Sequence, residues 1–205
     1  MNRSEYYREM KELARATREG YGLTTPRVQK SHLRKIYKAE GIRIDLWPHR
    51  LRDVRGAYFN DELGPSVMLD KKLPEDPMVF TMAHELKHHL VDRNLPVAYC
   101  SNRNMSEHIE IGAEIFAAEL IYPEGDFVAA MAAKGIGPGR CTPEDLVHLK
   151  RETRTTLSYT GLAKRATFLG FAASGSLDGT KWKKLEEEIY GVPVYKRIPR
   201  RRLGS

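Results

Sequence analysis

The sequence predicts an α+β fold that is mostly helical, with a small three-stranded sheet ahead of one central helix. Apolar residues recur at helical spacing along most of the chain, as in 4–19, where Tyr6, Met10 and Leu13 share one face. Three segments with strand character precede the central helix, at 42–46, 56–60 and 66–70. Because these segments are grouped and do not alternate with helices, the pattern favours an α+β arrangement over an α/β one.

Glycine and proline bound the first two helices. The helix over 4–19 is followed directly by a glycine, which ends it. Thr25–Pro26 is typical of an N-cap followed by proline at the first helical position. We therefore expect a second helix from Pro26 to about Glu40, with Gly41 as its end.

The central helix is expected to begin at Asp76–Pro77 and to run to about Asp92, and a polar loop over 94–105 follows it. Further helices are expected at 106–122, 124–134, 143–154, 159–169 and 180–190. We expect 1–135 to form one domain and 136–205 to form a helical extension with a basic tail, packed on that domain.

Composition excludes several classes of protein. Hydrophobic residues make up 41% and charged residues 30% of the 205 positions, which is typical of a globular chain and not of a disordered one. No apolar run approaches the roughly 20 residues of a membrane span, and the first twenty residues are too charged for a secretory signal. Cys100 and Cys141 are too few for a disulfide framework. We expect a cytoplasmic protein with no membrane association.

The central helix contains the motif His84-Glu85-Leu86-Lys87-His88. Residues four apart lie on one face of a helix, so both imidazoles can point at one ion. Glu85 projects to the side of that face, where its carboxylate can take a proton from water without binding the ion. The opposite face is apolar and is expected to enter the core through Val79, Ala83, Leu86 and Leu90. The motif therefore predicts two metal ligands and a general base.

The predicted helix over 106–122 offers a third ligand. A hydrolytic zinc site takes three protein ligands and leaves one position open, and no histidine follows the motif at the metzincin spacing. Glu107, Glu110 and Glu114 lie on one side of this helix. We favour Glu110 as the ligand and Glu114 as the partner that orients a ligand histidine, with Glu114 as the alternative ligand. Glu107 and Glu119 are expected to be exposed or helix-capping.

These residues predict one Zn²⁺ per chain, with another first-row ion as the alternative, because imidazole and carboxylate groups bind several such ions. An extended peptide can pair with an exposed strand, for which 66–70 is the candidate. His89, Tyr99 and Tyr122 are close enough in sequence to donate to a transition-state oxyanion, although ordinary packing is the favoured role for each.

The segments FTMAHELKHHL and EIGAEIFAAELIYP resemble the ImmA/IrrE family of metallopeptidases. The resemblance extends to SVMLD and to TLSYTGLAKRATFLGF, and so covers roughly residues 25–170. It implies a zincin-like metallopeptidase domain in which His84, His88 and Glu110 bind zinc and Glu85 is the general base. It also implies a narrow protein substrate, a helix-turn-helix transcriptional repressor whose cleavage derepresses phage, mobile-element or stress genes.

Three residues depart from the pattern of that family. Lys87 stands where glycine is common and places a charge next to the metal-binding face. Glu114 stands where asparagine is usual and adds a second carboxylate, and Tyr122 replaces a common methionine.

Two other classes of function compete with a peptidase. In the first, the protein is a DNA-binding regulator with a vestigial site: the net charge is +7, and 143–154 and 159–169 are spaced like a helix-turn-helix with Lys164 and Arg165 available for phosphate. We favour the interpretation that these two helices pack on the domain formed by 1–135. In the second, the protein is an accessory interaction partner, which purification without bound metal would indicate.

Overall fold

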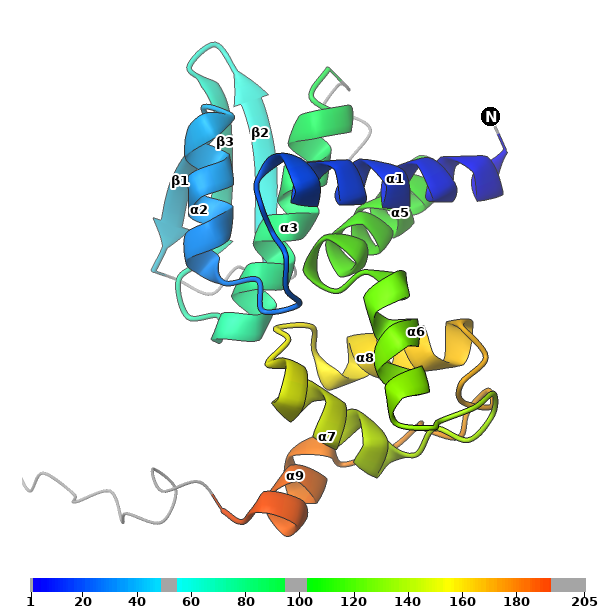
Figure 1. Ribbon diagram of the computed structural model, residues 1–205. Coiled ribbons are helices and arrows are strands. Elements are labelled where there is room, and N and C mark those ends of the chain that lie inside the picture. Colours follow the sequence, from blue (N-terminus) through cyan, green and yellow to red (C-terminus); the bar gives the residue numbers. More distant parts are fainter. Residues whose placement is uncertain (1, 49–54, 95–102, 193–205) are drawn as a thin grey trace, which may run out of the picture.

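The computed structural model describes residues 2–48, 55–94 and 103–192 (Figure 1). The helices are α1 (Arg3–Gly20), α2 (Lys30–Ala39), α3 (Glu75–Val91), α5 (Arg103–Ile121), α6 (Glu124–Ala133), α7 (Pro143–Thr153), α8 (Tyr159–Phe168) and α9 (Trp182–Tyr190), and the strands are β1 (Arg43–Trp47), β2 (Gly56–Asp61) and β3 (Gly64–Asp70). Helices predominate around one three-stranded sheet in this part of the chain, which confirms the predicted α+β, zincin-like fold class. None of the described helices is both long enough and apolar enough to cross a bilayer.

The sheet is mixed, and its strands lie in the order β1-β3-β2. β1 runs parallel to β3, with Ile44 opposite Val67, whereas β2 runs antiparallel to β3, with Tyr58 opposite Val67. The central helix α3 contacts both β2 and β3. The prediction that 66–70 is an exposed strand is wrong, because β3 is hydrogen-bonded to a neighbour on each side. Among the described strands the sheet edges are β1 and β2.

The start of α2 differs from the prediction. The helix begins at Lys30 and not at Pro26, and the Gln29 N–H donates to Nδ1 of His32 at 3.1 Å at its N-terminus. The preceding residues follow a non-helical path because Val28 is buried and its carbonyl accepts a hydrogen bond from Oγ1 of Thr156 at 2.6 Å. A tertiary contact therefore overrides the local threonine–proline signal.

The start of α5 also differs from the prediction. The helix begins at Arg103, inside the segment 94–105 that was expected to be a loop. Residues 103–106 contain neither glycine nor proline, so nothing local prevents the additional turn. The rest of that expected loop, 95–102, lies outside the described residues, as does Cys100.

Glu119 joins three helices. Its side chain is fully buried, and its carboxylate lies 2.8 Å from Nε of Arg15 in α1 and 3.3 Å from a guanidinium nitrogen of Arg165 in α8. The carboxylate also accepts the N–H of Glu124 at 3.0 Å and so caps α6. Of the two roles expected for Glu119, capping is confirmed and exposure is wrong, because two guanidinium groups compensate the buried charge.

The helices that follow residue 136 make polar contacts with the preceding part of the chain. Lys150 of α7 lies 2.8 Å from a carboxylate oxygen of Asp76 in α3, and Arg165 of α8 donates to the backbone carbonyl of Tyr122. Figure 1 shows α7 and α8 at the end of the molecule away from the sheet, with α9 beyond them. The core is continuous across this boundary, since buried residues of α7 and α8 belong to the same apolar cluster as those of α3.

Replacing Glu119 with alanine is expected to lower the free energy of unfolding by about 3–5 kcal/mol, because the buried guanidinium of Arg165 loses its carboxylate partner. Urea denaturation measures the difference. Glu12→Ala is the matched control, since the Glu12–Arg8 pair is 3.9 Å long with side chains 63% and 67% exposed, and it is expected to change stability very little. Equal effects of the two substitutions would contradict the role given to Glu119.

Candidate metal centre

The predicted site residues lie on α3 and α5. The core side of α3 is formed by Val79, Ala83 and Leu86, which are all fully buried, as the helical period predicts. His84 and His88 lie on another side, one turn apart, with side chains 18% and 14% exposed. Glu110 of α5 faces both of them and is 49% exposed. The three side chains therefore meet at a place that solvent can reach.

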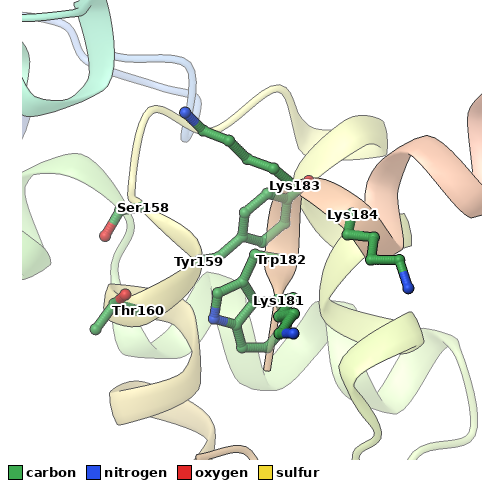
Figure 2. A pocket seen from close by; sticks show the side chains of 7 residues that line it. All are labelled: Ser158, Tyr159, Thr160, Lys181, Trp182, Lys183 and Lys184. Carbon is green, nitrogen blue, oxygen red and sulfur yellow. The ribbon is translucent and has the colours of Figure 1, made fainter. Parts of the chain in front are cut away.

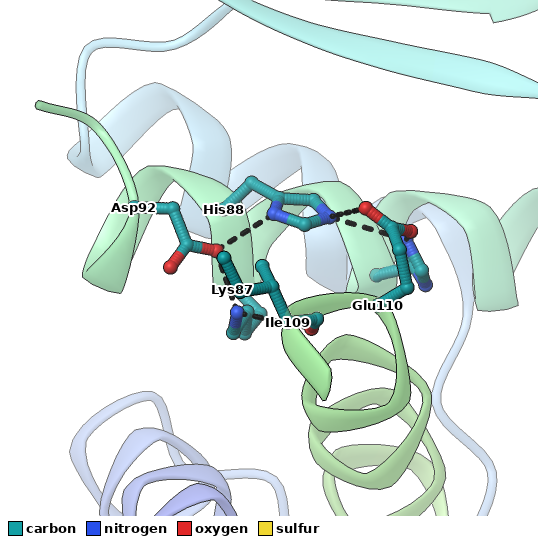
Figure 3. Close-up of polar contacts among 6 residues, drawn as sticks. Lys87, His88, Asp92, Ile109 and Glu110 are labelled. Atoms are coloured by element: carbon teal, nitrogen blue, oxygen red, sulfur yellow. Dashed lines mark hydrogen bonds and ion pairs between the residues drawn. The ribbon is translucent and has the colours of Figure 1, made fainter. Parts of the chain in front are cut away.

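The donor atoms of this cluster lie close together, and Figure 3 shows the His88 ring and the Glu110 carboxylate pointing at one another. The Nε2 atoms of His84 and His88 are 3.2 Å apart. One carboxylate oxygen of Glu110 lies 3.1 Å from Nε2 of His84, and the other lies 3.7 Å from Nε2 of His88. Within the described residues, these three are the group of histidine, cysteine or acidic side chains that can hold a metal ion.

The distances fit a single divalent cation. Zinc lies about 2.0–2.2 Å from imidazole nitrogen and carboxylate oxygen, which places the corners of its coordination tetrahedron about 3.3–3.6 Å apart. The two Nε2 atoms are 3.2 Å apart, and each lies 3.1 or 3.7 Å from one of the two Glu110 oxygens, so the distances bracket this range. Two imidazoles and one carboxylate also leave a fourth position open, as hydrolytic sites require.

Asp92, at the C-terminal end of α3, orients His88. The Nδ1 atom of His88 lies 2.7 Å from Oδ2 of Asp92. Burial acts to raise the pKa of Asp92, but hydrogen bonds from His88 and Lys87 outweigh it and the pKa is lowered. The ionised carboxylate therefore keeps the proton of His88 on Nδ1 and leaves the Nε2 lone pair free for a cation. Sequence reasoning missed Asp92, although its position four residues after His88 was a usable signal.

Glu85 lies beside the cluster and does not belong to it. Its side chain is only 6% exposed, and its carboxylate accepts a hydrogen bond from the backbone N–H of Tyr58 in β2. Burial raises the pKa of Glu85, while the charges of His84 and His88 oppose this effect. A carboxylate in such a position is a stronger proton acceptor than one in water.

Glu114 pairs with a lysine of α8 and does not belong to the His84–His88–Glu110 cluster. Its carboxylate is 56% exposed and is 3.5 Å from Nζ of Lys164 in α8. The structure therefore differs from the expectation that Glu114 orients a ligand histidine, because Asp92 of α3 occupies that position on His88. Glu107 is exposed, as expected.

The side chains considered as oxyanion donors are held elsewhere. His89 is buried, with Nδ1 3.1 Å from the Tyr58 hydroxyl and Nε2 3.6 Å from a carboxylate oxygen of Glu40. Tyr122 is buried and packs edge-on against Phe127. Both have the packing role that was favoured for them, and Tyr99 lies outside the described residues.

Glu110 and Glu114 of α5 are expected to differ strongly in their effect on metal binding. Glu110→Gln removes the carboxylate that faces Nε2 of both His84 and His88, so the affinity for zinc should fall by more than the roughly 10–100-fold loss typical when a residue that only orients a ligand is replaced. Glu114→Gln loses only a surface pair with Lys164 and is the matched control. Competition with a chromophoric chelator measures both dissociation constants, and the reverse order would assign the third ligand to Glu114.

A separate hollow of about 540 Å³ lies between α8 and α9 (Figure 2). Tyr159 and Trp182 stack there with ring centroids 5.3 Å apart, and three lysines, Lys181, Lys183 and Lys184, line the rim. No histidine, cysteine or acidic residue lines it, so it is not a second candidate for the metal site.

Comparison with known families agrees with this geometry. Residues 38–136 match the family model of the M78 peptidases, described as an IrrE N-terminal-like domain. No curated protein matches the chain significantly. The matched range contains the sheet, α3, α5 and α6, and thus the whole His84–His88–Glu110 cluster, whereas α1 and α7 to α9 lie outside it. The match of residues 38–136 to this family model confirms the resemblance to the ImmA/IrrE metallopeptidases.

Proposed function

We propose that this protein is a zinc-dependent endopeptidase in which His84, His88 and Glu110 hold the cation and Glu85 is the general base. The observation that carries the proposal is the convergence of two imidazole nitrogens and one carboxylate within 3.1–3.7 Å of one another, beside a buried glutamate. Zinc is proposed because two histidines, one glutamate and an open position are typical of catalytic zinc in peptidases.

The residues of this chain account for the proton transfers of peptide hydrolysis. A bound cation supplies a Lewis acid that acidifies water and polarises the scissile carbonyl. Glu85 then accepts a proton from the attacking water and returns it to the leaving amine. The Tyr58 N–H holds the Glu85 carboxylate in place, and the hydrogen bond to Asp92 fixes the His88 ring.

The substrate that we propose is a helix-turn-helix transcriptional repressor, whose cleavage would derepress phage, mobile-element or stress genes. An extended segment of such a protein can add to an edge strand through backbone hydrogen bonds. β3 lies in the middle of the sheet and β2 lies at one edge. β2 contacts α3, the helix that carries His84 and His88. Tyr58 of β2 touches Glu85, so a peptide along this edge lies next to the general base.

One of the two residues expected to contact phosphate in a DNA-binding regulator, Arg165, is not available for that contact. Arg165 is 7% exposed and is bound to Glu119 and to the Tyr122 carbonyl. Lys164 is exposed but lies 3.5 Å from Glu114. These contacts favour packing of α8 on α5 over recognition of DNA.

The decisive assay incubates the full-length protein with helix-turn-helix repressors encoded beside its gene, with and without a chelator. We expect defined fragments only without the chelator, and renewed cleavage after zinc is added back. Cleavage that survives both the chelator and Glu85→Gln would contradict a metallopeptidase. Intact repressors in the presence of a zinc-loaded protein that cleaves unfolded casein would contradict the proposed substrate alone.

A further inference from the structure

Lys87, inside the metal-binding motif, is fully buried. Its Nζ lies 2.6 Å from Oδ2 of Asp92 and 3.2 Å from the backbone carbonyl oxygen of Ile109 (Figure 3). The ammonium also faces the ring of Tyr6 in α1, 5.5 Å from its centroid. Burial lowers the pKa of Lys87, and the hydrogen bond to Asp92 opposes that shift. A lysine removed from water in this way needs its acceptors, because an unpaired buried charge is strongly destabilising.

Both acceptors of Lys87 lie next to a proposed metal ligand. The Asp92 oxygen that binds Nζ also binds Nδ1 of His88, at 2.7 Å. Ile109 immediately precedes Glu110 in α5, so its carbonyl belongs to the turn that carries the third ligand. One ammonium group therefore connects the outer partner of a ligand on α3 with the backbone beside a ligand on α5.

Packing around the ammonium confines it to this position. Tyr6 covers it from α1, and the Tyr6 ring approaches α5 closely because residue 112 is a glycine. A Cβ at Gly112 would lie 2.6 Å from Cε1 of Tyr6, well inside van der Waals contact. The N-terminal helix, which lies outside the residues that match the family model, thus covers the Lys87 ammonium.

We infer that Lys87 is a positioning residue for the metal centre: its ammonium holds the Asp92 carboxylate on His88 and holds the Ile109 turn, with Glu110, against α3. The inference rests on the proposed function, since it assigns Lys87 a role in the same cation site. Through Asp92, Lys87 fixes the tautomer of His88 that leaves Nε2 unprotonated. Through Ile109, it fixes the distance between the two helices that supply ligands.

The test measures zinc affinity and the His88 tautomer in the wild type, Lys87→Met, Asp92→Asn and the double variant. Lys150→Met is a close control, because the Lys150 ammonium also binds a carboxylate, Asp76, and two carbonyls, and also lies 5.5 Å from a tyrosine ring centroid. Asp76 lies eight residues before His84, which is about 12 Å along the helix axis. Lys150→Met therefore reports what the loss of a half-buried lysine with the same kinds of partner does to stability alone.

We expect Lys87→Met to weaken zinc binding about 10–100-fold, and Lys150→Met to leave it within twofold. Lys87 acts partly through Asp92. The fold-loss of zinc affinity in the double variant should therefore be smaller than the product of the losses in the two single variants. In the metal-free protein, ¹⁵N shifts should show His88 protonated on Nδ1 in the wild type and a mixture of tautomers in Lys87→Met. This readout requires neither metal nor activity.

Zinc affinity within twofold of the wild type in Lys87→Met, together with an unchanged His88 tautomer, would overturn the inference and leave the proposed function intact. A wild type that binds no zinc would instead contradict the proposed function itself. If Lys87→Met does not fold, Lys87→Gln replaces it, because glutamine keeps a hydrogen-bond donor without the charge. Zinc affinity of Lys87→Gln within twofold of the wild type, with an unchanged His88 tautomer, would then overturn the inference.

Discussion

Glu85→Gln is expected to lower the rate of peptide hydrolysis by about 10²–10⁴-fold while the cation stays bound. Glutamine keeps the shape of the side chain and can still accept the Tyr58 N–H through its amide oxygen, but it cannot take a proton from water. Single-turnover cleavage of a repressor or of a fluorogenic peptide measures the rate, and metal analysis of the same preparation measures occupancy.

The control for this substitution is Glu75→Gln, which removes an exposed carboxylate from the first turn of the same helix. It should leave both the rate and the metal content unchanged. A rate for Glu85→Gln close to that of Glu75→Gln would contradict the assignment of the general base, whereas loss of metal from Glu85→Gln would show that Glu85 is a ligand.

His84→Ala is expected to remove the cation and the activity together. Without this imidazole, only His88 and Glu110 remain in the cluster, and a divalent ion loses one of its three protein ligands. Metal content should fall from one equivalent per chain to near zero after dialysis. The increase in melting temperature that zinc gives the wild type should also disappear, because a ligand that does not bind the native state cannot stabilise it.

His148→Ala provides the comparison, because it removes an imidazole from α7 whose Nδ1 is bound to the Tyr190 hydroxyl at 2.6 Å. This variant should keep its metal and the zinc-dependent increase in melting temperature. Stoichiometric zinc in dialysed His84→Ala would place the ion elsewhere in the chain.

Periodicity along single helices was sufficient to predict the centre of the site. The spacing of His84 and His88, and the apolar residues on another face of α3, required only the 3.6-residue repeat. Glu110 and Glu114 could not be separated in this way, because both project from the same side of α5. The packing of α5 on α3 brings Glu110 within 3.1–3.7 Å of the two imidazoles and leaves Glu114 beside Lys164, and that information is not local in the sequence.

Tertiary contacts explain what the sequence did not reveal. Strand periodicity identified β3 but not its place between β1 and β2, because alternation reports which face is buried and not which strands pair. The burial of Glu119 depends on Arg15 and Arg165, which are remote from it in the sequence, so local pattern could not predict it. Lys87 was expected to place a charge near the metal helix, but its burial depends on Tyr6 from α1.

The central claim is that one cation binds between His84, His88 and Glu110, and anomalous X-ray scattering at the zinc edge tests it most directly. The claim predicts a single anomalous peak about 2.0–2.2 Å from Nε2 of each histidine and from a carboxylate oxygen of Glu110. A zinc-soaked crystal with no peak there, or with its peak on Glu114, would contradict it.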